Sequence, residues 1–109
     1  MKIDHIDCFK GGWFLGSFDP SLLKTEDFEV GYKKHTKEEG VESHVHYQVT
    51  EYNLMISGEM VVNGVTVTKG LIFIIPPGEA VKVDVVSDVV EVICVKTPSI
   101  PEDKELCEL

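Results

Sequence analysis

Short stretches of alternating apolar and polar residues fill most of the chain, with turn residues between them. A period of two is typical of half-buried β-strands, because successive side chains of a strand point to opposite faces. The stretches cover residues 28–34, 42–48, 51–57, 59–62, 65–68, 71–75, 81–86 and 89–95. Seven or eight short strands at this spacing predict an all-β sandwich or barrel with almost no helix.

Turn residues mark where the chain reverses between these strands. Asn63-Gly64 stands between two alternating stretches, and this dipeptide is a strong signal for a tight β-hairpin. Pro76-Pro77-Gly78 ends the apolar run before it and predicts a second turn. No repeat or low-complexity tract interrupts the series.

The chain divides into three parts on this pattern. Residues 1–27 are irregular and rich in aromatic side chains, which predicts an N-terminal arm that packs on the barrel or on a partner subunit. Residues 28–97 form the barrel, and residues 98–109 form an acidic C-terminal tail.

The strand predicted at 51–57 carries large apolar side chains on the face opposite Glu51. Tyr52, Leu54 and Ile56 share that face. If the Glu51 face lines the barrel, the other face must be covered by the N-terminal arm or by a second subunit. We therefore expect a homodimer.

Composition places the chain among ordinary globular proteins. It has 109 residues, 43% of them hydrophobic and 27% charged, which suits one compact domain. No apolar run approaches the ~20 residues that span a bilayer, so a membrane role is not expected. The formal net charge of −9 repels nucleic acids and anionic lipids, which leaves small molecules as the expected ligands. All ten basic residues are Lys, and the lack of Arg weakens the case for a phosphorylated substrate.

Cysteine usage indicates a reducing compartment. Cys8, Cys94 and Cys107 make an odd number and show no metal-ligand spacing, so no disulfide framework is expected. The first residues carry acids and no apolar stretch, so they predict no signal peptide. We therefore expect a cytoplasmic protein.

Two histidines and a glutamate form the candidate chemistry. His44 and His46 stand two apart on one predicted strand and so share a face, and Glu51 begins the next strand. Two imidazoles and a carboxylate on one face make a site for a single divalent metal ion, with Fe, Mn, Ni and Zn not distinguished. The alternative is a chance pair of surface histidines beside a solvated strand end.

The residues around this group resemble a known family. Gly40-x3-His44-x-His46-x4-Glu51-x6-Gly58 resembles the first motif of the cupin superfamily, with the first gap two residues short. Gly70-x5-Pro76-x-Gly78 resembles the start of the second cupin motif. The resemblance covers roughly residues 28 to 95. It implies a cupin-type β-jelly-roll barrel, or double-stranded β-helix, with His44, His46 and Glu51 as the metal ligands.

One departure from the family pattern concerns the fourth ligand. The second cupin motif has a His where this chain has Val81 and an Asn where it has Val85. A three-ligand site leaves positions open for a chelating substrate. Alternatively, the loss weakens metal binding and the histidines only hold a small polar ligand. His35 or Gln48 could fill the gap, although neither stands at the motif position.

Strand parity extends the candidate pocket beyond the metal ligands. Residues that share a face with Glu51 or with the second-motif position Val81 point inward, and a phenol follows His46. The predicted pocket residues are Asn53, Met55, Tyr47, Val81, Val83 and Cys94. The simpler explanation for most of them is ordinary strand packing, and Cys94 has no base beside it that would make it a nucleophile.

Two function classes follow. The first is a metal-dependent enzyme acting on a small chelating substrate, as a dioxygenase, isomerase, decarboxylase or lyase; fold alone does not choose among these reactions. The second is a non-catalytic cupin that binds a small sugar or hydroxy acid.

Overall fold

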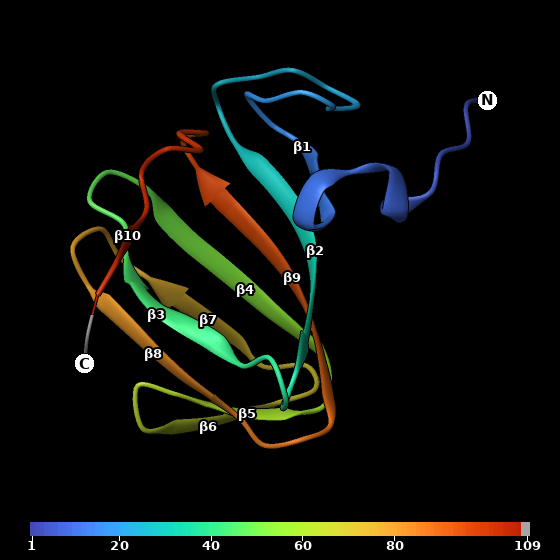
Figure 1. The fold of residues 1–109 in the computed structure, drawn as a ribbon. Helices are drawn as coiled ribbons and strands as arrows, with labels where there is room; N and C mark the ends of the chain where they lie inside the picture. Colours follow the sequence, from blue (N-terminus) through green and yellow to red (C-terminus); the bar gives the residue numbers. More distant parts are fainter. Residues whose placement is uncertain (108–109) are drawn as a thin grey trace.

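The computed structural model describes residues 1–107 and consists of two antiparallel β-sheets packed face to face (Figure 1). One sheet has the strand order β1-β2-β9-β4-β7, and the other has the order β10-β3-β8-β5-β6. Apart from the β1-β2 and β5-β6 pairs, strands that neighbour each other in a sheet are not consecutive in the chain, as in a jelly roll. This arrangement confirms the all-β jelly-roll prediction.

The strands follow the predicted stretches closely. Their bounds are β1 Trp13–Leu15, β2 Glu29–Thr36, β3 Val41–Val45, β4 Thr50–Ser57, β5 Glu59–Val62, β6 Val65–Thr68, β7 Ile72–Ile75, β8 Ala80–Val85, β9 Val89–Thr97 and β10 Glu105–Leu106. Two 3-10 turns precede them, η1 Ile6–Cys8 and η2 Lys10–Gly12. Within residues 1–107 no helix is long and apolar enough to cross a membrane.

The predicted hairpin joins β5 to β6. Asn63 and Gly64 have φ angles of 47° and 80°, the left-handed conformation that a two-residue hairpin turn of this kind needs at both positions. Val62 pairs directly with Val65 across the turn. The turn thus sets the register that places Met60 and Val67, also paired, on the buried face.

The core lies between the two sheets at the end of the barrel away from the C-terminal tail. Its buried members are Met55, Met60, Val62, Val67, Ile75, Val81, Val90 and Val92. They come from both sheets, so the core joins the two layers and supplies the apolar burial that stabilises the barrel.

Strand β2 forms where the sequence predicts it, but the face that it turns to the barrel interior carries polar side chains. Its alternation suggested that the apolar side chains would face the interior. Instead Glu29, Lys33 and His35 line the cavity inside the barrel, while Tyr32 lies on the opposite face and donates a hydrogen bond to Glu91. The reason is that β2 borders a polar cavity rather than the apolar core.

Both ends of the chain join the barrel. The N-terminal arm contributes β1, which pairs with β2, and the Trp13 ring covers Gly31 so closely that a Cβ there would lie 2.6 Å from it. The C-terminal tail contributes β10, which pairs with β3, and its Asp103 is buried. The last two residues of the predicted tail lie outside the described part of the chain.

Candidate metal centre

The two histidines lie where β3 ends and the chain turns toward β4. His44 is on β3 and His46 follows the strand, and their exposed fractions are only 8% and 3%. The turn of the second motif holds this segment in place, because the Gly78 N–H donates to the His46 carbonyl at 2.6 Å. Gly78 has φ +85°, a conformation that favours glycine, which explains why the Pro-x-Gly sequence carries a glycine beside the histidines.

Hydrogen bonds at the outer ring nitrogens orient both imidazoles. His44 Nδ1 lies 2.9 Å from the Glu42 carbonyl oxygen, and His46 Nδ1 bonds to the Asp103 carbonyl oxygen. A carbonyl oxygen only accepts, so each Nδ1 carries the proton and donates. In the neutral rings each Nε2 is therefore left as a lone pair directed into the barrel, as in metal-ligating histidines.

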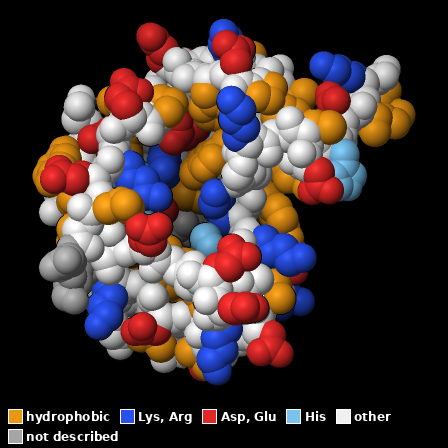
Figure 2. Space-filling view, viewed as in Figure 1, with side chains coloured by type: hydrophobic (Ala, Val, Ile, Leu, Met, Phe, Trp, Pro, Cys, Tyr) orange, Lys and Arg blue, Asp and Glu red, His pale blue; other side chains and the backbone are white. Residues whose placement is uncertain are grey.

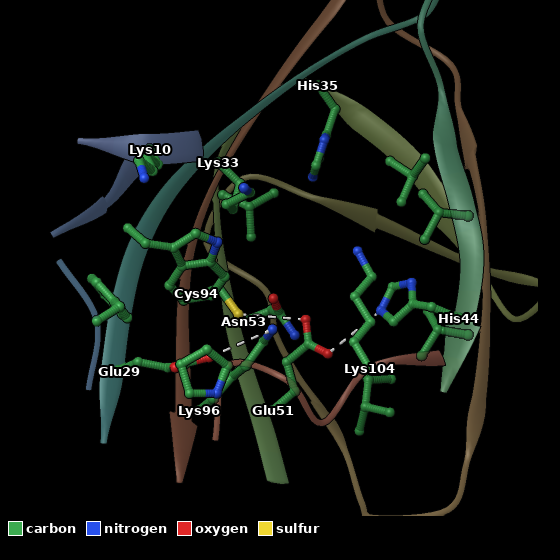
Figure 3. A pocket seen from close by; sticks show the side chains of 18 of the residues that line it. Lys10, Glu29, Lys33, His35, His44, Glu51, Asn53, Cys94, Lys96 and Lys104 are labelled. Atoms are coloured by element: carbon green, nitrogen blue, oxygen red, sulfur yellow. Dashed lines mark hydrogen bonds and ion pairs between the residues drawn. The ribbon is translucent and has the colours of Figure 1, made fainter. Parts of the chain in front are cut away.

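The two lone pairs converge on the Glu51 carboxylate. Glu51 Oε2 lies 3.9 Å from His44 Nε2 and 3.6 Å from His46 Nε2, which is too long for hydrogen bonds. His46 Nε2 and Glu51 Oε2 are buried with no hydrogen-bond partner among the described residues. Figure 3 shows Glu51 directed toward His44 at the base of the cavity. Three electron-pair donors thus face one another.

Electrostatics favours the protonation states that bind a metal. Burial acts to raise the pKa of Glu51, but the neighbouring His44, Lys96 and His46 outweigh burial and lower the pKa to about 2. Burial lowers the pKa of His46 and outweighs its bond to the Asp103 carbonyl. Near neutral pH the site therefore holds an ionised carboxylate and a neutral imidazole.

A divalent metal ion fits this donor set. All three ligand atoms lie within 4.8 Å of one another, and the separations between Glu51 and the two histidines are 3.6 Å and 3.9 Å. An ion about 2.1 Å from each ligand atom would draw the three atoms closer together than this. Two histidines and one carboxylate form a ligand set that leaves further coordination positions open.

The predicted gap in the ligand set is filled by an apolar side chain. Val81 pairs with His44 across β3 and β8 and is only 4% exposed. Neither substitute considered from sequence replaces the missing histidine: His35 lines the cavity outside the three-residue metal group, and Gln48 is exposed. The open side of the metal group therefore faces an apolar wall.

Asp103 supports the site in a way that sequence reasoning missed. Its carboxylate accepts hydrogen bonds from the backbone N–H groups of Tyr47, Gln48 and Val49 at 3.1, 2.8 and 3.0 Å. These bonds lower the pKa of Asp103 although burial opposes them. The same residue orients His46 through its carbonyl oxygen. No sequence signal marks it, because it lies more than 50 residues away, in a tail with no motif.

A cavity of about 310 Å³ opens above the metal group, a size typical of small-molecule sites. Four predicted pocket residues line this cavity: Asn53, Val81, Val83 and Cys94. Figure 2 shows the hollow, with apolar side chains inside it and lysines around it.

Two predicted pocket residues lie elsewhere. Met55 points inward as expected but lies deeper, in the apolar core, where it is 1% exposed. Tyr47 lies outside the cavity and is 58% exposed, because the chain turns away after His46.

Cys94 is a buried thiol rather than a nucleophile. Burial is the main cause that raises its pKa, and its Sγ donates to Glu51 Oε1 at 3.4 Å. The thiol therefore stays protonated and supports the carboxylate.

Comparisons with known proteins bear on the fold. No protein-family model matches the chain, and no curated protein matches it either. Solved structures do. An uncharacterised conserved protein of Klebsiella pneumoniae with a double-stranded β-helix domain shares 22% identity and a TM-score of 0.69, over 99% of this chain and 93% of that one. This chain has the cupin fold.

Two further structures agree. A cupin protein of Bacteroides fragilis matches with 19% identity and a TM-score of 0.56, over 76% of this chain and 80% of that chain. An RmlC-like cupin of Methanocaldococcus jannaschii matches with 23% identity and a TM-score of 0.58, over 69% and 73%. Identities this low establish the fold alone, and the argument for the metal group rests on the geometry of this chain's own residues.

Proposed function

We propose that this cupin holds one divalent metal ion through His44, His46 and Glu51, and that it acts on a small chelating organic substrate at that ion. The observation that carries the proposal is the convergence of three electron-pair donors without a proton between them. Such a group is costly by itself, because His46 Nε2 and Glu51 Oε2 are buried without a hydrogen bond among the described residues. A cation between the donors removes that cost.

The residues around the ligands define what a bound substrate meets. A bound divalent metal supplies Lewis-acid polarisation of a substrate oxygen, and O₂ chemistry if the metal is iron. Val81, Val83 and Phe73 form an apolar wall of the cavity, and Asn53 Nδ2 is a buried donor with no partner among residues 1–107. This amide is free to donate to a substrate oxygen. Sites of this kind serve dioxygenases, isomerases, decarboxylases and lyases, which a substrate screen distinguishes.

Metal content tests the proposal directly. Untagged protein purified without chelators should contain about one equivalent of Fe, Mn, Ni or Zn by elemental analysis, and the His44→Ala/His46→Ala double variant should contain almost none. His35→Ala is the matched control, since His35 lines the same cavity outside the metal group and its loss should leave the metal content unchanged. Metal absent from native protein, even after reconstitution with each of the four ions, would contradict the proposal.

The alternative function is non-catalytic binding of a small sugar or hydroxy acid. It is favoured by one observation, the apolar Val81 at the position where the family pattern has its fourth ligand. The two functions differ in their need for metal. A binding module keeps its affinity for the ligand after the metal is removed by a chelator. An enzyme loses its turnover when the metal ligand is changed by Glu51→Gln.

The exposed face of β4 and β7 supports a homodimer. Five apolar side chains cover this face: Tyr52, Leu54, Ile56, Ile72 and Ile74. The N-terminal arm does not cover it, because β1 pairs with β2 at the other edge of the same sheet (Figure 1). Because the N-terminal arm does not cover this apolar face, we expect a second subunit to cover it.

Sedimentation measurements test the dimer. Native protein should sediment as a dimer, and Ile74→Lys should sediment as a monomer because it places a charge in the interface. Val65→Lys is the control, since Val65 is equally exposed but lies on β6 in the other sheet. A native monomer would contradict this part of the proposal.

The cysteines fit a reducing compartment such as the cytoplasm. Cys8, Cys94 and Cys107 are all free thiols. Fractionation of the source cells tests this location, and recovery of the protein outside the cytoplasm would contradict it.

A further inference from the structure

Lysine side chains surround the cavity of a protein that is strongly acidic overall. Four of the ten lysines line it, namely Lys10, Lys33, Lys96 and Lys104, although the formal net charge is −9. Figure 3 shows Lys33, Lys96 and Lys104 in the cavity that Glu51 and His44 line, with Lys96 beside Glu51. They come from β2, β9 and the C-terminal tail, so three distant segments bring positive charge to one place.

Most of the acidic groups in the cavity are already paired. Glu29 Oε1 lies 3.7 Å from Lys96 Nζ, and Asp19 pairs with Lys24 at 2.7 Å. Glu51 is the third acidic side chain of the cavity and belongs to the metal group. Two of the three cavity carboxylates thus have lysine partners, and positive charge is left over.

Lys10, Lys33 and Lys104 are the cavity lysines without a carboxylate partner among residues 1–107. Lys33 Nζ donates to the Gly11 carbonyl at 2.6 Å and lies 5.2 Å from the centre of the Trp13 ring. Lys96 Nζ lies 4.6 Å from the same ring. The Trp13 ring is thus in cation–π range of two ammonium groups at the cavity wall.

The ammonium groups are close enough to repel one another. Burial lowers the pKa of Lys33, and the positive charges of Lys96 and Lys104 lower it further. A cluster of like charges in a partly desolvated cavity is relieved by an anion that binds among them.

We propose that the cavity binds a small organic acid, with one carboxylate held by Lys33 and Lys104 at the mouth and a second oxygen group directed to the metal group at the base. This inference rests on the proposed metal site. The two ends of the cavity select the two ends of the ligand, and the apolar wall of Val81, Val83 and Phe73 contacts the carbons between them. The ligand class is therefore a dicarboxylate or a keto or hydroxy acid.

A carboxylate suits this site better than a phosphate. The chain contains no Arg, the side chain whose planar fork matches a phosphate group. The experiment must therefore distinguish phosphate binding from carboxylate binding.

Calorimetric titration of metal-loaded protein tests the inference. The probes are oxalate, malonate, succinate and glutarate, with the neutral diamide malonamide and inorganic phosphate as comparisons. We expect saturable binding of at least one dicarboxylate and none of malonamide. Metal content is measured after each titration, so that extraction of the ion by the probe is recognised.

Matched variants assign the binding to the lysines. Lys33→Gln and Lys104→Gln should each weaken the tightest dicarboxylate about tenfold, because each removes one charge-assisted hydrogen bond. Lys34→Gln is the control: Lys34 neighbours Lys33 on β2 but is exposed on the opposite face. Lys96 is left intact, because its loss would leave the buried Glu29 unpaired. Circular dichroism confirms that each variant is folded.

The outcomes separate this inference from the metal proposal. Equal affinities for native protein, Lys33→Gln and Lys104→Gln overturn it, even if the metal is present at one equivalent. Tighter binding of phosphate than of every dicarboxylate, with the same lysine dependence, overturns the carboxylate assignment. A third outcome is that His44→Ala/His46→Ala binds the dicarboxylate as tightly as native protein and that this binding still depends on the lysines. That result supports the contact with the lysines and overturns the contact with the metal group.

Discussion

The inner face of β4 passes from a polar region to an apolar one within five residues. Glu51 and Asn53 line the cavity, whereas Met55 lies in the core. The paired strand β9 changes in step, since Lys96 stands opposite Glu51 and Val92 stands opposite Met55. The two regions share one face, one strand pair and one backbone geometry. Depth in the barrel, rather than strand parity, decides whether a side chain is available for a ligand.

This difference predicts that the two regions respond differently to substitution. The apolar region contributes the burial that stabilises the barrel. The polar region contains buried donors and acceptors without partners, which cost stability until a ligand satisfies them. Changes at the apolar end should therefore affect folding first, and changes at the polar end should affect binding first.

Met55→Ala is the substitution with the largest expected effect on stability. Met55 is fully buried between the sheets, so truncation should lower the free energy of unfolding by about 3 kcal/mol. Urea denaturation of metal-free protein measures the change. Val65→Ala, at an exposed strand position, is the control and should cost less than about 0.5 kcal/mol. Equal costs for the two variants would remove the distinction between core and surface on which the comparison depends.

Glu51→Gln should have opposite effects on binding and on stability. Removal of the charged ligand should weaken metal binding about 100-fold, as measured by competition with a fluorescent chelator. In metal-free protein the new amide can donate to His46 Nε2, which should raise the free energy of unfolding by about 1 kcal/mol.

The direction of the change in the free energy of unfolding makes Glu51→Gln informative. Glu42→Gln is its control, since Glu42 is exposed and only its backbone carbonyl contacts His44. A metal-free Glu51→Gln variant less stable than native protein would mean that the three donors are not in conflict.

Asp103→Ala should lower both the stability of the protein and its affinity for metal. It removes three backbone hydrogen bonds to the segment that carries His46, which should lower the free energy of unfolding by about 2 kcal/mol. The segment also positions the His46 ring, so metal affinity should fall about tenfold. Glu102→Ala, at the exposed position next to it, should change neither quantity. Loss of stability without loss of metal affinity would show that the tail does not orient His46.

Much of the barrel could be predicted because its determinants are local. The alternation of apolar residues sets each strand, and Asn63-Gly64 sets the hairpin through two positive φ angles. The spacing of His44 and His46 was equally informative, since residues two apart on a strand share a face. These features depend on neighbours in the sequence and require no knowledge of the rest of the fold.

The features that escaped prediction depend on distant segments. The inner face of β2 is polar because it meets a cavity, and nothing in residues 28–34 reveals that cavity. Lys33 lines the cavity, and no pattern in the sequence marks it. Asp103 was missed for the same reason, since its hydrogen-bond partners lie more than 50 residues earlier. Alternation separates the two faces of a strand but does not show which face meets solvent, core or cavity.

The pH dependence of stability gives the smallest expected effect and isolates the Asp103 carboxylate. Burial acts to raise its pKa, but the N–H groups of Gln48, Tyr47 and Val49 outweigh burial and lower the pKa below the ordinary value of 3.8. A carboxyl group with a lowered pKa in the folded state contributes stability above its unfolded value, and this contribution is lost as the pH falls through the folded value. The stability difference between native protein and Asp103→Ala should therefore be full near neutral pH and shrink below pH 3.8.

Urea denaturation of metal-free protein at about pH 6 and about pH 3 measures this difference. Glu102→Ala should track native protein at both pH values, because its side chain accepts none of these backbone bonds. A stability difference between native protein and Asp103→Ala that stays constant with pH would mean that the carboxylate charge adds nothing. The segment carrying His46 would then be held by the packing of β10 on β3 alone.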